Sequence, residues 1–207
     1  MKCHILDLNF GNIESISSAL RHVGSEINLV QSSKDFKNVQ RLIIPGVGSF
    51  NSFMNRTKEG NMDYEIKKIV KKGVPVLGIC LGMQVLLSKG YEFGEIDGLN
   101  ILKGSVKKLD NKFNNKKTKL PFVGWQTMTI NKYCNQLIKD CNPFQFYHMH
   151  SYFCEMSESH NVYGYTNYND KLIPSLISDE NTFGVQFHPE KSGKAGLNLL
   201  SNFIQIK

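Results

Sequence analysis

The stretch from Gly78 to Gly82 constrains the fold of this chain more than any other. It has the form G-x-C-x-G and directly follows the apolar run Val74 to Leu77. The sequence predicts a short buried strand, a tight turn that carries Cys80, and a helix that begins at Leu81. The two glycines let the strand and the helix approach without Cβ clashes. Such a turn holds a cysteine at a helix N-terminus, where backbone N–H groups favour the thiolate. A buried cysteine that only packs is the alternative.

A second motif lies near the C-terminus, where residues 182–187 alternate and are rich in β-forming side chains. This pattern predicts a strand, and His188 follows it at the end where such sheets expose their working residues. Glu190 stands two positions further on and can reach the imidazole nitrogen that faces away from a cysteine. That is the orienting role of the third group in a catalytic triad. A surface His-Pro-Glu turn is the alternative, but the two motifs in one chain favour a Cys-His-Glu triad.

A third motif is the run I-I-P-G-V-G-S-F over residues 43–50. A buried strand over 41–44 leads into a glycine turn, and a helix is expected after it. Such a turn can present backbone N–H groups to an anion, here the oxyanion of a tetrahedral intermediate. An ordinary strand-to-helix loop is the alternative.

Taken in this order, the three motifs resemble the triad-type (class I) glutamine amidotransferases. Within that family the sequence most resembles the glutaminase subunits of imidazole glycerol phosphate synthase, over residues 45–50, 78–84, 124–125, 150–153 and 184–192. The resemblance runs from Asp7 to the end of the chain. Its most specific parts are Gly-Met-Gln after the cysteine turn and His-Pro-Glu-Lys-Ser near the C-terminus.

The resemblance implies a role for each matching residue. Cys80 would attack the side-chain amide of L-glutamine and form a γ-glutamyl thioester, His188 would transfer protons, and Glu190 would orient His188. The oxyanion hole would comprise Val47, Gly48 and the N–H of Leu81. Glutamine would be held by Gly48, Gln84, Ser151 and Tyr152. The surface that meets a partner would include Asn12, Trp125 and Lys191. No cofactor and no metal are expected.

The resemblance also implies a partner, a (β/α)8-barrel synthase subunit in a heterodimer. The barrel would receive the ammonia and make imidazole glycerol phosphate and aminoimidazole-carboxamide ribotide in histidine biosynthesis. The isolated glutaminase subunit is expected to be poorly active until the partner docks. A catalytically idle regulatory subunit is a further hypothesis, but the intact Cys80, His188 and Glu190 argue against it.

Two stretches that are expected on the partner-binding surface depart from the sequence motifs of the family. Leu8 and Asn9 replace the tyrosine and first glycine of Asp-Tyr-Gly-x-Gly-Asn, and residues 121–126 read Pro-Phe-Val-Gly-Trp-Gln in place of Pro-His-Met-Gly-Trp-Asn. Phe122 and Gln126 are among the changed positions. These departures leave open a paralogue that supplies ammonia to a barrel partner for surface-sugar modification.

Composition narrows the class of protein. The chain has 207 residues, 41% of them apolar and 21% charged, which suits a single domain over residues 1–207. It has no apolar stretch long enough to span a bilayer and no signal-peptide pattern. The five cysteines are odd in number, scattered and without a C-x-x-C pair: Cys3, Cys80, Cys134, Cys141 and Cys154. This usage argues against disulfides and zinc and indicates the cytoplasm.

Two features invite binding hypotheses that the sequence does not favour. The net charge of +7 is concentrated at Lys107, Lys108 and residues 112–119. Without a nucleic-acid motif beside them, these lysines predict a solvated loop or hairpin tip, or a positive rim that steers an acidic partner. His148 and His150 share one face of a predicted strand, but no third ligand stands nearby at metal-binding spacing.

The order of the expected elements predicts an α/β fold, with a mostly parallel central sheet, helices on both faces and an antiparallel flank. The expected strands of the first half are 2–8, 26–31, 41–44 and 74–79, and its helices are 12–23, 63–72 and 81–88. After Gly104 the expected strands are 105–109, 127–130, 144–150, 162–166, 175–178 and 182–187. A closing helix is expected over 193–206.

Overall fold

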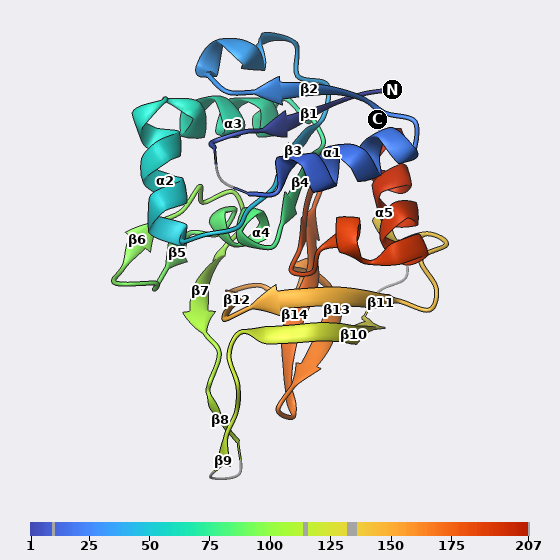
Figure 1. The fold of residues 1–207 in the computed structure, drawn as a ribbon. Coiled ribbons are helices and arrows are strands. Elements are labelled where there is room, and N and C mark those ends of the chain that lie inside the picture. Colours follow the sequence, from blue (N-terminus) through green and yellow to red (C-terminus); the bar gives the residue numbers. More distant parts are fainter. Residues whose placement is uncertain (10, 114–115, 132–135, 207) are drawn as a thin grey trace.

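The computed structural model describes residues 1–9, 11–113, 116–131 and 136–206 (Figure 1). Its centre is a nine-stranded sheet with the order β11-β10-β13-β14-β15-β4-β3-β1-β2. One half is parallel and comprises β1 (Lys2–Leu6), β2 (Glu26–Val30), β3 (Leu42–Ile44), β4 (Val76–Ile79) and β15 (Thr182–Val185). The other half is antiparallel and comprises β14 (Lys171–Asp179), β13 (Val162–Tyr168), β10 (Phe122–Ile130) and β11 (Gln145–His150).

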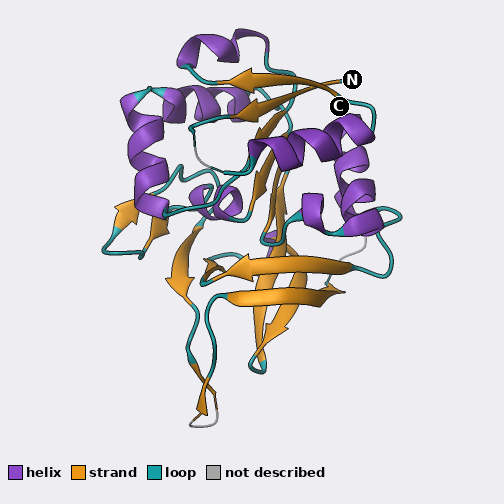
Figure 2. Ribbon diagram, in the orientation of Figure 1, coloured by secondary structure: helices purple, strands orange, loops and turns teal. Residues whose placement is uncertain are grey.

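Helices cover both faces of the parallel half (Figure 2). On one face lie α1 (Ile13–His22) and α5 (Gly193–Gln205), and on the other lie α2 (Phe50–Glu59), α3 (Met62–Lys71), α4 (Leu81–Val85) and the 3₁₀ helix η1 (Ser33–Asn38). The alternation along β3 explains both layers. Ile43 packs in the core with α1 and α5, whereas Leu42 and Ile44 pack in the core with α2 and α3. This arrangement confirms the predicted α/β fold.

Helix α1 shows how local sequence sets an element's ends. The side chain of Asn12 accepts a hydrogen bond from the N–H of Ser15 at 3.2 Å and caps the N-terminus. Ile16 and Leu20 are buried, one turn apart on the face that meets the sheet. The helix ends before Gly24, where the sequence predicted its stop.

A second sheet lies beside the antiparallel half, with the order β12-β7-β5-β6. Its strands are β12 (Tyr152–Met156), β7 (Gly104–Lys108), β5 (Lys89–Gly90) and β6 (Ile96–Asp97). Ser151 alone separates β11 in the first sheet from β12 in the second. Three further 3₁₀ helices are η2 (Gln136–Ile138), η3 (Ser159–Asn161) and η4 (Pro189–Lys191).

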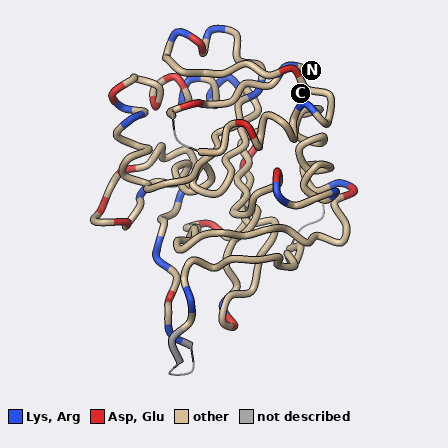
Figure 3. Tube along the Cα trace, in the orientation of Figure 1, with Lys and Arg blue, Asp and Glu red and all other residues tan. Residues whose placement is uncertain are grey.

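The lysine-rich segment forms a narrow hairpin of β8 (Lys112–Phe113) and β9 (Lys116–Lys117), paired antiparallel. It extends from the body of the molecule, as the ribbon shows, and basic residues lie on the two arms that lead to it (Figure 3). The expected hairpin tip is therefore confirmed. None of the described helices has both the length and the apolar character needed to cross a membrane.

Several expected elements are corrected. The strand expected over 2–8 ends at Leu6, the one over 127–130 begins at Phe122, and the one over 175–178 begins at Lys171. The helix after Cys80 ends at Val85, not at residue 88, because Leu86 and Leu87 turn back with tighter bonds to the carbonyls of residues 83 and 84. The last strand ends at Val185, before Gln186. The strand expected over 105–109 does not extend the main sheet, because β7 pairs with β12 and β5.

Candidate active site

The turn between β4 and α4 holds Cys80 in a strained conformation. Its φ is 54° and its ψ is −107°, a combination that non-glycine residues rarely adopt. The main chain on both sides keeps it there: the N–H of Cys80 donates to the carbonyl of Val185 at 2.8 Å, and its own carbonyl accepts from Gln84 at 3.2 Å. A Cβ at Gly82 would stand 1.7 Å from the carbonyl oxygen of Ile44. Only glycine at this position lets α4 lie so close to β3. The predicted tight turn at Cys80 is therefore confirmed, and this turn is called the elbow below.

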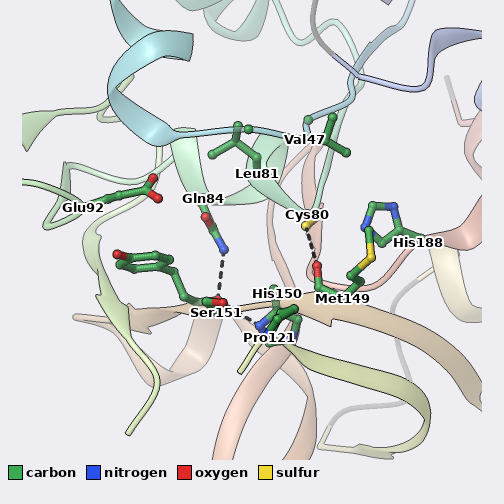
Figure 4. Close-up of a pocket in the computed structure, with 13 residues that line it drawn as sticks. Val47, Cys80, Leu81, Gln84, Glu92, Pro121, Met149, His150, Ser151 and His188 are labelled. Atoms are coloured by element: carbon green, nitrogen blue, oxygen red, sulfur yellow. Dashed lines mark hydrogen bonds between the residues drawn. The ribbon is translucent and has the colours of Figure 1, made fainter. Parts of the chain in front are cut away.

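The elbow opens into a cavity of about 340 Å³, a size suited to a small molecule (Figure 4). Residues from six separate stretches of the sequence form its wall: Gly46, Val47, Gly48, Cys80, Leu81, Gln84, Glu92, Pro121, Met149, His150, Ser151, Tyr152 and His188. All residues predicted for the oxyanion hole and for glutamine binding are in this set. Glu92, Pro121, Met149 and His150 were not predicted as site residues.

His188 and Glu190 form a buried pair beside the cysteine. Nδ1 of His188 lies 2.9 Å from Oε1 of Glu190, and the two side chains are only 4% and 6% exposed. The main chain fixes the imidazole, because the N–H of His188 donates to Tyr147 at 2.9 Å and its carbonyl accepts from the hydroxyl of Ser192 at 2.6 Å. Since an ionised carboxylate only accepts, Nδ1 carries a proton and Nε2 is left to face Cys80.

The charge state of His188 reflects opposing effects. Burial lowers its pKa, but interactions with Cys80 and Glu190 outweigh burial and raise the pKa to about 10. Within the described residues Nε2 makes no hydrogen bond of ordinary geometry, although Cys80 is near enough to act on its charge. The imidazole is therefore protonated at neutral pH, with a proton available on the side of the sulfur.

Comparison with known proteins identifies the group to which this site belongs. The family model described as "Glutamine amidotransferase class-I" matches residues 4–206. The subunit HisH of imidazole glycerol phosphate synthase from Caldanaerobacter subterraneus subsp. tengcongensis is 41% identical over 96% of this chain and 95% of its own length. The HisH subunit from Lactococcus lactis is 36% identical over 99% of this chain and 98% of its own length.

The chain belongs to the HisH branch of the class-I glutamine amidotransferases. The resemblance read from the motifs is thus confirmed over nearly the whole chain. Solved structures agree on the fold: a chain described as PurLQS from Thermotoga maritima aligns with a TM-score of 0.73 and 16% identity, and covers 98% of this chain and 97% of its own length. A solved glutamine amidotransferase aligns with a TM-score of 0.71 and 19% identity over 94% of both chains.

The residues predicted for this HisH-family chain's partner surface lie on one side of the candidate triad. Trp125 is 55% exposed on β10, and its ring meets the ring of Tyr147 edge-on at 6.3 Å. Nζ of Lys191 lies 5.9 Å from the centroid of the same Tyr147 ring. Asn12 and Lys191 line a second, small cavity together with His188 and other residues. The structure therefore brings Asn12, Lys191 and Trp125 into one neighbourhood, and adds Tyr147 to it.

The other described cysteines are chemically distinct from Cys80. Cys3, Cys141 and Cys154 are free and buried. Burial raises the pKa of Cys3 and that of Cys141 to about 12, and burial together with the charge on Cys80 raises that of Cys154. These three thiols remain protonated and inaccessible in the folded protein, whereas Cys80 lines the open cavity. Cys134 lies outside the described residues.

Proposed function

We propose that this chain is the glutaminase subunit of an imidazole glycerol phosphate synthase, which hydrolyses L-glutamine to glutamate and ammonia. The observation that carries the proposal is the strained Cys80 in an open cavity beside the buried His188–Glu190 pair. A partner (β/α)8-barrel subunit would use the ammonia to make imidazole glycerol phosphate and aminoimidazole-carboxamide ribotide in histidine biosynthesis. The two relatives support that reaction over surface-sugar modification, and the free cysteines of the described residues suit the cytoplasm.

The arrangement supports a two-stage reaction. The Cys80 thiolate adds to the side-chain amide carbon of glutamine, and the carbonyl oxygen becomes an oxyanion. As the C–N bond breaks, protonated His188 delivers its Nε2 proton to the nitrogen, and ammonia leaves a γ-glutamyl thioester. Water then attacks the thioester while His188 takes its proton, and glutamate leaves with the cysteine regenerated. Glu190 keeps the imidazole oriented and stabilises its positive form.

The wall of the cavity suits the two ends of glutamine. The N–H of Leu81 at the start of α4 and the N–H groups of Val47 and Gly48 are the oxyanion donors. Gly48 has a φ of 112°, a conformation that L side chains rarely adopt, so this loop depends on glycine. Glu92 is the acidic side chain of the wall and suits the α-ammonium group of the substrate. Its Oε2 also accepts from the N–H of Phe50 at 2.7 Å, which holds the carboxylate in place.

Gln84, Ser151 and Tyr152 complete the proposed substrate site. The amide nitrogen of Gln84 lies 3.1 Å from the main-chain oxygen of Tyr152 and 3.1 Å from Oε1 of Gln186. Both hydrogens of this amide are used inside the protein, which leaves its carbonyl oxygen to accept from the substrate. Ser151 and Tyr152 form the corner between the two sheets on the opposite wall.

The partner surface lies where the ammonia must leave. The small cavity of about 20 Å³ is lined by His188 and Glu190 of the triad and also by Asn12, Val47 and Lys191. A cavity of that size holds a single water-sized molecule, which suits ammonia. The exposed Trp125 beside it is the type of residue that anchors protein interfaces. A heterodimer with the barrel docked here passes ammonia on before bulk water protonates it.

The test is a glutaminase assay with and without the barrel subunit and its ligand. We expect glutamate release to rise strongly when the loaded barrel is present, and Cys80→Ala to abolish it while circular dichroism stays unchanged. Cys3→Ala is the matched control, because it removes a buried thiol that does not line the cavity. Sustained activity in Cys80→Ala would rule out the nucleophile. Activation by a sugar-modifying barrel, but not by the histidine-pathway barrel, would contradict the pathway.

A further inference from the structure

A row of buried hydrogen bonds runs from two histidines of β11 to the main-chain oxygen of Tyr152, and from there through two glutamine side chains to Cys80. Nδ1 of His150 lies 2.9 Å from the main-chain oxygen of Tyr152, and Nδ1 of His148 lies 3.2 Å from Nε2 of His150. A carbonyl oxygen only accepts, so Nδ1 of His150 carries the proton and its Nε2 accepts from His148. Burial, followed by repulsion from nearby imidazoles, lowers the pKa of His148, and burial lowers that of His150 to about 4. Both rings are therefore neutral, each as the tautomer that the row requires.

The same carbonyl oxygen fixes the orientation of two glutamine amides. Because the oxygen of Tyr152 only accepts, the neighbouring group of Gln84 must be its nitrogen, which gives its second hydrogen to Oε1 of Gln186. The nitrogen of Gln186 is thereby turned to the other side, where Nε2 lies 3.7 Å from Sγ of Cys80. The direction of every bond in the row follows from one main-chain oxygen. Gln186 thus presents a donor, not an acceptor, to the sulfur.

The atoms around the Cys80 sulfur differ in which form of the cysteine they favour, the thiol or the thiolate. Sγ of Cys80 also lies 3.8 Å from the main-chain oxygen of Met149, which accepts from a thiol and repels a thiolate. Gln186 favours the thiolate instead, and its side chain is fully buried, so water does not replace it. Its main chain is anchored as well, since its N–H donates to the carbonyl of Ser175 at 3.0 Å.

We propose that Gln186 is a positioning residue for the nucleophile, whose amide N–H donates to the Cys80 sulfur and favours the thiolate. The inference rests on the proposed function, because it concerns the sulfur that attacks glutamine. The titratable groups that face this sulfur are His188, from the segment after β15, and Cys154, from β12. Cys154 is a neutral buried thiol, so among the side chains that face the sulfur His188 and Gln186 offset the negative charge, in addition to the main chain at the start of α4.

The test measures the rate at which iodoacetamide labels Cys80 in the full chain, as a function of pH, by mass spectrometry. In Gln186→Met, which keeps the length of the side chain, we expect labelling at neutral pH to slow by about 10- to 100-fold, the effect of one hydrogen bond to a charged group. The pH of half-maximal labelling rises by about one to two pH units, by the same reasoning. Ser175→Ala is the matched control: it loses a buried hydrogen bond to Thr166 on the adjacent strand and keeps the parent curve.

A second measurement needs no variant of Gln186. The side-chain amide proton of Gln186, followed by NMR, should titrate with the same midpoint as Cys80 labelling, and the titration should vanish in Cys80→Ala. Identical labelling curves for the parent and Gln186→Met, or an amide signal that ignores the Cys80 titration, overturn this inference and leave the proposed function standing. Preferential labelling of a cysteine other than Cys80 overturns the nucleophile assignment itself.

Discussion

Replacing Gly82 by alanine tests whether the close approach of α4 to β3 is what builds the site. The new Cβ would stand 1.7 Å from the carbonyl oxygen of Ile44, whereas ordinary contacts begin at 3.4 Å. The obstacle is main chain in a hydrogen-bonded parallel strand, where Ile44 pairs with Gly78. The helix start must therefore move by more than 1 Å, and this motion carries Cys80 and Gln84 with it.

The cost follows from that displacement. Overpacking of a dense interior costs about 1–3 kcal/mol, and a main-chain clash lies at the upper end, so we expect Gly82→Ala to lower the free energy of unfolding by about 3 kcal/mol. For a chain of this length that corresponds to a fall in Tm of about 6–12 °C. A displacement of about 1 Å at the nucleophile costs about 100-fold in rate, so the partner-activated glutaminase activity should fall by that factor even where the variant is folded.

Urea denaturation followed by circular dichroism measures the first quantity, and the coupled glutaminase assay measures the second. Gly60→Ala is the control, because the one atom closer than 3.4 Å to its Cβ would be the flexible tip of the Met62 side chain, at 2.7 Å, and its φ of −87° suits alanine. A Gly82→Ala protein as stable and as active as Gly60→Ala would refute the claim that this contact shapes the elbow.

Three further outcomes are expected. His188→Asn should reduce glutamine hydrolysis more than Glu190→Gln, because the proton carrier matters more than the group that orients it; steady-state kinetics with the barrel subunit would show the reverse order if these roles were misassigned. The pKa of His188 is raised to about 10, above its ordinary value near 6.5. The interactions of His188 therefore contribute their full stabilisation below about pH 6.5, and this contribution is lost as the pH rises through 10. Urea denaturation of the parent at increasing pH should show this loss in the free energy of unfolding, and Glu190→Gln should show a smaller loss. Trp125→Ala should weaken barrel binding at least tenfold by calorimetry, as for an interface anchor, while Tyr64→Ala, which removes an exposed aromatic ring elsewhere, leaves the affinity unchanged.

The candidate catalytic stretches could be predicted because their information is local. The spacing of glycines around Cys80 encodes a strand, a tight turn and a helix, and the structure shows those elements with Cys80 in the turn. The spacing of two residues between His188 and Glu190 likewise lets the carboxylate reach the nearer ring nitrogen of the imidazole, and that hydrogen bond is present at 2.9 Å. In both cases a few neighbouring residues determine the geometry without help from the rest of the chain.

The unpredicted features depend on pairing between distant segments. Alternation along residues 105–109 indicates a strand but does not tell which strand it joins, so its place in the second sheet was missed. Glu92 reaches the cavity from the loop between β5 and β6, which carries no recognisable motif. The orientation of Gln186 depends on a carbonyl oxygen 34 residues away, at Tyr152, relayed through Gln84. No periodicity or residue spacing in the sequence predicts such a series of hydrogen bonds between distant segments.

The corner at Ser151 has a consequence for how the protein assembles itself. The chain leaves the nine-stranded sheet at His150 and enters the four-stranded sheet at Tyr152, and both residues line the cavity. The opposite wall comes from the elbow on the parallel half, far earlier in the sequence. The cavity therefore exists only where both sheets have formed and packed together, so its wall depends on contacts between segments far apart in the sequence. His188, which follows the last strand of the sheet, completes the same wall.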